Sequence, residues 1–160
     1  LVFQNPTLLR RTVLSNMEFI ADIYKNIDRK MIQNCLTRCG LKGYDQKSAR
    51  LLSGGEKQGV AFGRSLYFNS DLIVLDEPTM GLSIQETEKV LNFVKGLKQE
   101  NKSAIFIDHN IIHVYGAANR FIILDRGEVV GEFKKDEISR EELVQKMIQL
   151  HESGKIKVEA

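Results

Sequence analysis

The chain has 160 residues, the size of one domain, and its 42% hydrophobic and 28% charged residues exclude a disordered chain. The 23 Lys and Arg residues nearly balance the 21 Asp and Glu residues, and a net charge of +2 lacks the basic excess of a nucleic-acid-binding domain. Aliphatic runs such as Leu72–Leu75 are far shorter than the roughly 20 residues of a membrane-spanning helix, so we expect no direct membrane insertion.

Residues 1–52 predict loops and helices, because no strand-like apolar run follows the first few positions. Asp28 precedes an apolar stripe at helical spacing and Gly40 follows it, so these two residues predict the start and the stop of a helix. Cys35 and Cys39 lie on one face of that helix, and we interpret them as core residues of a protein in a reducing compartment.

Beyond Ser53 the pattern changes to helices that alternate with short strands. Three continuous apolar runs are typical of strands buried on both faces of a parallel sheet: Leu72–Leu75, Ala104–Ile107 and Phe121–Leu124. The S-x-x-E spacing predicts helix starts at Ser83–Glu86 and Ser139–Glu142, and Arg126–Gly127 predicts a hairpin turn. The alternation predicts an α/β fold with its core in residues 53–150, followed by a frayed tail, 151–160.

Two carboxylates, Asp76 and Glu77, follow the first predicted strand, and Pro78 ends it. The carboxyl ends of parallel strands form the ligand crevice of open α/β sheets, where two acids are costly unless they face a cation or a reacting water. His109 follows the next strand, so we expect it at the same edge, in contact with a phosphate. The alternative interpretation of the acidic pair is a turn without chemistry.

Another capping box, Ser53 with Glu56, encloses Gly54 and Gly55. The glycines remove side chains from the first helical turn, so an anion can reach backbone N–H groups at the positive end of the helix dipole. This arrangement favours phosphate binding, although a capping box alone indicates only a helix N-terminus. Gln4, before a predicted turn, is on its own an ordinary loop residue.

Together these segments resemble the second half of an ABC-type ATPase, the nucleotide-binding subunit of ATP-driven transporters. The resemblance runs from about Leu1 to Leu150 and rests on four motifs in the family's order: LVFQNPTLL as the Q-loop, LSGGE as the signature, LIVLDEPT as the Walker B strand and IFIDHN as the switch histidine. It implies a partial P-loop-NTPase-type parallel sheet with flanking helices, with the Q-loop and a helical subdomain in residues 1–52.

The resemblance also implies roles in ATP hydrolysis. Asp76 would hold Mg²⁺, Glu77 would act as general base on the attacking water, and His109 would contact the γ-phosphate. Gln4 would reach the metal and sense the transporter. The signature residues would bind the γ-phosphate of ATP held by a second ATPase subunit in a head-to-tail dimer: Ser53, Gly54, Gly55 and Glu56.

Part of the family pattern is missing from this sequence. It contains no G-x-x-x-x-G-K-[ST] motif, and the P-loop formed by that motif lies upstream of the Q-loop in the family. Because the chain begins at Leu1 without an initiator Met, we expect that it is cut just before the Q-loop and that alone it hydrolyses no ATP. The resemblance places the missing strand beside the Walker B strand, which predicts an exposed apolar edge there.

The predicted function is that of an ATP-binding and ATP-hydrolysing subunit of a transporter. The stretches DEPTMGLS and IFIDHNIIHVYGAANRFIILDRGEVVGE look closest to the ATPases of simple-sugar importers. That likeness implies a membrane permease as partner and a peripheral place on the cytoplasmic face of the cell membrane. Two alternatives are an ABC-type ATPase outside transport and a non-catalytic piece that donates only its signature motif to a partner.

Overall fold

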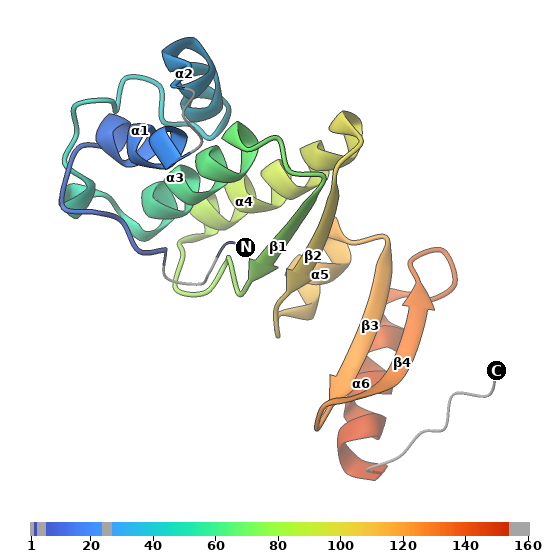
Figure 1. Cartoon of the computed structure of the whole chain (residues 1–160). Coiled ribbons are helices and arrows are strands. Elements are labelled where there is room, and N and C mark those ends of the chain that lie inside the picture. The colour runs from blue at the N-terminus through green and yellow to red at the C-terminus, as the bar shows by residue number, and fades with distance from the viewer. Residues whose placement is uncertain (1, 3–5, 24–26, 154–160) are drawn as a thin grey trace. The chain divides into compact units, whose positions relative to one another are not determined.

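The computed structural model describes residues 2, 6–23 and 27–153, so the predicted site residue Gln4 lies outside the described residues. The chain forms two compact units, Leu1–Asp108 and His109–Ala160 (Figure 1). Helices flank a parallel strand pair, and the predicted α/β class is confirmed. In the described ranges we find no helix with the length and apolar character that crossing a bilayer requires.

The first unit is organised around one central helix, α3. Its helices are α1 (Val13–Ile23), α2 (Arg29–Arg38), α3 (Gly54–Tyr67) and α4 (Ile84–Leu97). As Figure 1 shows, α3 lies between α1 and α2 on one side and α4 on the other. Phe62 of α3 stacks on Phe93 of α4 with ring centroids 4.4 Å apart. Gly59 faces the end of α2, where an added Cβ would lie 3.2 Å from the carbonyl oxygen of Cys39, so a side chain there would force the helices apart.

The helix predicted between Asp28 and Gly40 is confirmed as α2. The Asp28 carboxylate accepts a hydrogen bond from the Met31 N–H at 3.0 Å, and Gly40 has a φ of +74°, which suits a helix stop. Cys35 is buried and Cys39 half-buried against the core. Burial raises the pKa of the Cys39 thiol to about 12, so this thiol stays protonated and unreactive at neutral pH.

The parallel pair consists of β1 (Leu72–Asp76) and β2 (Ser103–Ile107), in a register that sets Asp76 opposite Ile107. Val2 pairs with the other edge of β1: its N–H donates to Val74 O at 2.7 Å, and its carbonyl accepts from the Asp76 N–H at 3.0 Å. Val2 thus covers the part of the predicted open edge of the Walker B strand that lies at Leu75. Exposed apolar side chains lie on both strands: Leu72 of β1 is 51% exposed, and Ile105 and Ile107 of β2 are each 49% exposed.

The second unit contains α5 (Ile111–Ala117), β3 (Arg120–Asp125), β4 (Glu128–Lys134) and α6 (Arg140–Ser153). The predicted hairpin turn is confirmed, with φ of +48° at Arg126 and +85° at Gly127, the backbone that a tight two-residue turn requires. The Phe121 ring stacks on that of Tyr115, at 5.4 Å between centroids, above a small core. Residues 151–153 of the predicted tail continue α6.

The prediction that Phe121–Leu124 is buried on both faces of a parallel sheet is wrong. Its strand, β3, pairs with β4 in antiparallel fashion, so the neighbour is the next strand of a hairpin. Phe121 faces the core of the unit, whereas Ile122 and Leu124 are 50% and 67% exposed. A continuous apolar run therefore belongs here to a strand covered on one face.

A buried amide ties the loop after the N-terminus to the central helix. Asn16, on α1, is fully buried; its Oδ1 accepts from the Leu9 N–H at 2.8 Å and from Arg64 Nη2 at 2.9 Å. Its Nδ2 donates to the carbonyl oxygens of Leu9 at 3.1 Å and Thr12 at 3.0 Å. Burial lowers the pKa of Arg64, on α3, because it disfavours the charged guanidinium, and the hydrogen bonds to Asn16 offset part of that cost.

Replacing Asn16→Leu keeps the bulk of the side chain but leaves the Leu9 N–H and part of the Arg64 guanidinium without an acceptor. We expect a loss of about 3 kcal/mol in the free energy of unfolding, measured by urea denaturation, because unsatisfied buried donors are costly. Asn92→Leu, at an exposed position of α4, is the matched control and is expected to change stability by less than about 0.5 kcal/mol. Equal effects of the two variants would contradict this role of Asn16.

Candidate functional site

Glu77 has a strained backbone at the carboxyl end of the parallel pair. β1 ends at Asp76, and Glu77 follows with a φ of +44°, in the left-handed region that non-glycine residues rarely adopt. Its N–H donates to Ile107 O at 2.8 Å, so the end of β2 holds the turn, and its carbonyl accepts from the Met80 N–H at 3.2 Å. Such strain persists where the surroundings over-determine it, which occurs most often at functional sites.

A second contact joins the same two strand ends. The Thr79 hydroxyl donates to Asp108 Oδ2 at 2.5 Å, and Thr79 is 5% exposed. The turn after β1 is thus anchored to the residue after β2 by a side-chain bond as well as by the Glu77 backbone. Sequence reasoning missed this pair, because a threonine and an aspartate far apart in the chain carry no spacing signal.

His109, predicted at this edge, is the first residue of the second unit and is exposed. It directly precedes Asn110, whose Oδ1 caps α5 by accepting from the Ile112 N–H at 3.1 Å and the His113 N–H at 3.4 Å. The structure therefore places His109 between the end of the parallel pair and a helix start. That its imidazole contacts the γ-phosphate of ATP stays a prediction.

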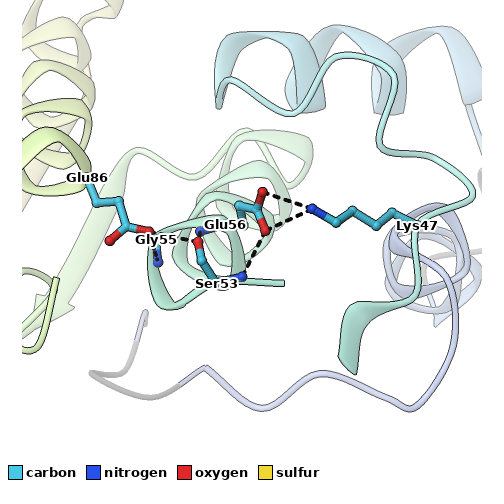
Figure 2. Close-up of polar contacts among 5 residues, drawn as sticks. All are labelled: Lys47, Ser53, Gly55, Glu56 and Glu86. Atoms are coloured by element: carbon cyan, nitrogen blue, oxygen red, sulfur yellow. Dashed lines mark hydrogen bonds and ion pairs between the residues drawn. The ribbon is translucent and has the colours of Figure 1, made fainter. Parts of the chain in front are cut away.

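The capping box predicted at the start of α3 is confirmed. Ser53 Oγ accepts from the Glu56 N–H at 3.2 Å, and Glu56 Oε2 accepts from the Ser53 N–H at 2.8 Å (Figure 2). Lys47 Nζ donates to both Glu56 oxygens, at 3.0 and 3.2 Å. Partial burial opposes ionisation of Glu56, but the bonds from Ser53 and Lys47 outweigh it and lower its pKa. Glu56 thus fastens the first turn of α3 to the preceding loop.

A carboxylate from α4 reaches the same helix start. Glu86 Oε1 accepts from Ser53 Oγ at 2.7 Å and from the Gly55 N–H at 3.2 Å (Figure 2). Its Oε2 accepts from the Ser83 N–H at 3.1 Å and from Ser83 Oγ at 2.9 Å, which confirms the predicted capping box of α4. Sequence reasoning identified Glu86 only as a capping residue, because its local spacing carries no signal for a second helix.

The hydrogen bonds to Glu86 favour its ionised form. The Ser53 hydroxyl contributes most, followed by the backbone and side chain of Ser83, and together they lower the pKa of Glu86 from 4.5 to about 2. The carboxylate is therefore ionised at any physiological pH. Its negative charge lies beside the positive N-termini of α3 and α4.

The lowered pKa of Glu86 predicts acid sensitivity of the first unit. A group whose pKa is depressed by folding contributes stability above its unfolded pKa, and this contribution is lost as the pH falls through the folded pKa. We expect the difference in unfolding free energy between wild type and Glu86→Gln to shrink as the pH falls from 4.5 to about 2. Chemical denaturation across that window measures it.

Glu88→Gln, which removes the same charge at an exposed position of α4, is the control. A difference between wild type and Glu86→Gln that stays constant across the window would contradict the assignment of the shift to Glu86.

Asp76 is the carboxylate that the sequence predicts as a metal ligand. In the parts of the chain that the structure describes, no group of three or more His, Cys, Asp and Glu side chains is placed to hold a metal ion. Mg²⁺ in nucleotide sites usually takes one or two protein carboxylates, with phosphates and waters as its other ligands. Half-buried Asp76, at the end of β1, fits that limited requirement.

Comparisons with known proteins find relatives that share these segments. The family model described as ABC transporter matches residues 1–80. The xylose/arabinose import ATP-binding protein XylG of Sulfolobus acidocaldarius is 43% identical over 96 residues, 60% of this chain and 38% of that protein. The L-cystine transport system ATP-binding protein TcyN of Escherichia coli is 34% identical over 134 residues, 81% of this chain and 54% of that protein.

A solved structure shares the fold as well. A dimeric, post-hydrolysis state of an ATP-binding cassette bound to ADP and Pi matches with a TM-score of 0.73 and 31% sequence identity. The match covers 84% of this chain and 61% of that one. The chain thus spans less than two thirds of the length of each of these three proteins.

Proposed function

The chain belongs to the ABC transporter family, and we propose that it forms the signature and Walker B part of a subunit that hydrolyses ATP to drive transport. The observation that carries the proposal is the strained turn at the end of β1. Glu77 keeps a φ of +44° beside half-buried Asp76, with its N–H donated to Ile107 O, while Thr79 of the same turn donates to Asp108. This geometry supports the proposal, because Asp76 and Glu77 follow the end of a strand, at the edge where ligands of α/β sheets bind.

In the proposed reaction a water oxygen attacks the γ-phosphorus of ATP, and the bond to the bridging oxygen breaks to release ADP. Catalysis of this step is mainly positioning and charge stabilisation. Glu77 orients the water and accepts its proton, and His109 contacts the γ-phosphate. Asp76 and Gln4 are the ligands proposed for Mg²⁺, which when bound neutralises charge on the phosphates.

The signature residues act on nucleotide held by another copy. Ser53 Oγ and the N–H groups of Gly54 and Gly55 lie at the positive end of α3, where they suit the γ-phosphate of ATP. The family relative solved with ADP and Pi is a dimer, which supports a head-to-tail pair of ATPase subunits. Glu56 contributes by bracing this turn, since its oxygens bond to Ser53 and Lys47.

A membrane permease is the proposed partner, which would hold the subunit at the cytoplasmic face of the membrane. The solute is proposed to be a simple sugar. The relative named for xylose and arabinose supports this class, and the relative named for L-cystine supports an amino acid as the competing one. Uptake of labelled xylose and L-cystine by the source cells, with and without the gene, separates the two. Loss of L-cystine uptake alone would contradict the sugar proposal.

Replacing Glu77→Gln in the whole protein removes the proton acceptor and keeps the size of the side chain. We expect turnover, measured as phosphate release, to fall by roughly 10²–10⁴-fold, while binding of ATP is retained. Glu88→Gln, an exposed carboxylate change on α4, is the control and is expected to keep full turnover. Wild-type turnover by Glu77→Gln would contradict the assignment of the general base.

A further inference from the structure

The N-terminus of α3 already holds an anion that comes from its own chain. Glu86, on α4, places Oε1 at 2.7 Å from Ser53 Oγ and 3.2 Å from Gly55 N (Figure 2). Both donors belong to the set proposed to bind a γ-phosphate. A carboxylate oxygen and a phosphate oxygen are both negatively charged acceptors, so they compete for the same N–H and O–H groups.

The contact is possible because Gly55 has no side chain. A Cβ at this position would lie 2.6 Å from Glu86 Cγ and 2.7 Å from Oε1, closer than van der Waals contact allows. The space that glycine leaves open at the helix start is thus filled by the Glu86 side chain. A phosphate that hydrogen-bonds to the Gly55 N–H needs this same space, and its charge would repel the carboxylate.

We infer that Glu86 is an internal occupant of the signature anion site, which a phosphate has to displace before it can bind Ser53 and Gly55. The inference rests on the phosphate-binding role proposed for these two residues. While the site holds no phosphate, Glu86 satisfies the donors at the start of α3. When phosphate arrives, part of the binding free energy is consumed in breaking the two bonds of Oε1, so Glu86 lowers the affinity of the site.

The other half of the carboxylate makes displacement feasible. Oε2 bonds to the Ser83 N–H and to Ser83 Oγ, both on the α4 side. A movement of Glu86 away from α3 can therefore preserve the capping box of α4. The arrangement also links the two helix starts, because a phosphate that enters at α3 changes the contacts of the segment before α4.

The test is a titration of the isotope-labelled chain with inorganic phosphate, against chloride at equal ionic strength, followed by NMR at the Gly55 amide. In Glu86→Gln the competing negative charge is gone, although an amide oxygen remains. We expect the phosphate concentration that half-saturates the Gly55 response to fall roughly tenfold, since charged hydrogen bonds are about twice as strong as neutral ones.

Glu142→Gln is the matched control. Glu142 forms the same kind of capping box at the start of α6, with Oε2 at 2.8 Å from Ser139 N and 2.7 Å from Ser139 Oγ. Its substitution removes the same charge and the same cap in the second unit, and we expect it to leave the phosphate titration unchanged. If Glu86→Gln does not fold, Glu86→Asp shortens the reach towards α3 and is expected to lower the half-saturating concentration as well.

The outcomes separate the inference from the function on which it rests. Phosphate binding at Gly55 that is unchanged or weaker in Glu86→Gln would overturn the inference. Glu86 would then have only a structural role, as a contact between α3 and α4. The phosphate-binding role of the signature would then stand. A Gly55 amide that responds to phosphate in none of the variants would overturn both.

Discussion

The positive N-terminal end of α3 is the constraint on which the first unit depends. A helix start leaves backbone N–H groups without internal partners, and two carboxylates gather around this one. Glu56 accepts hydrogen bonds from the Ser53 N–H and from Lys47, and Glu86 of α4 accepts one from the Gly55 N–H. The donors that Glu86 satisfies in the fold are those proposed to bind a nucleotide phosphate, so stability and proposed function involve the same groups of Ser53 and Gly55.

The rest of the unit holds this helix start in place relative to the strand edge. Stacking of Phe62 on Phe93 joins α3 to α4, and the buried Asn16–Arg64 contact joins α3 to the loop that follows the N-terminus. At the strand edge, the Thr79–Asp108 bond closes the turn that carries Glu77. These contacts connect the predicted signature to the segments on either side of it.

The sequence predicted best those features that depend on interactions between residues close together in the chain. Helix starts at Asp28 and Ser83 follow from side-chain capping within three residues, and both are confirmed. Strand neighbours are set by remote residues, so local patterns did not predict that Val2 pairs with part of the edge of the Walker B strand. The second partner of Glu86 could not be predicted for the same reason, since it depends on how two helices pack. Residue patterns alone singled out Asp76, Glu77 and the start of α3, whereas the roles proposed for them come from the resemblance.

The central claim is that the start of α3 binds the γ-phosphate of ATP held by a second copy of the subunit. The most direct test is a structure of the full-length protein that carries Glu77→Gln, determined with Mg-ATP bound. We expect a dimer in which the γ-phosphate lies within hydrogen-bonding distance of Ser53 Oγ and the Gly55 N–H of the opposite subunit, with Glu86 Oε1 withdrawn from both. A nucleotide whose phosphates contact no residue of α3 would contradict it.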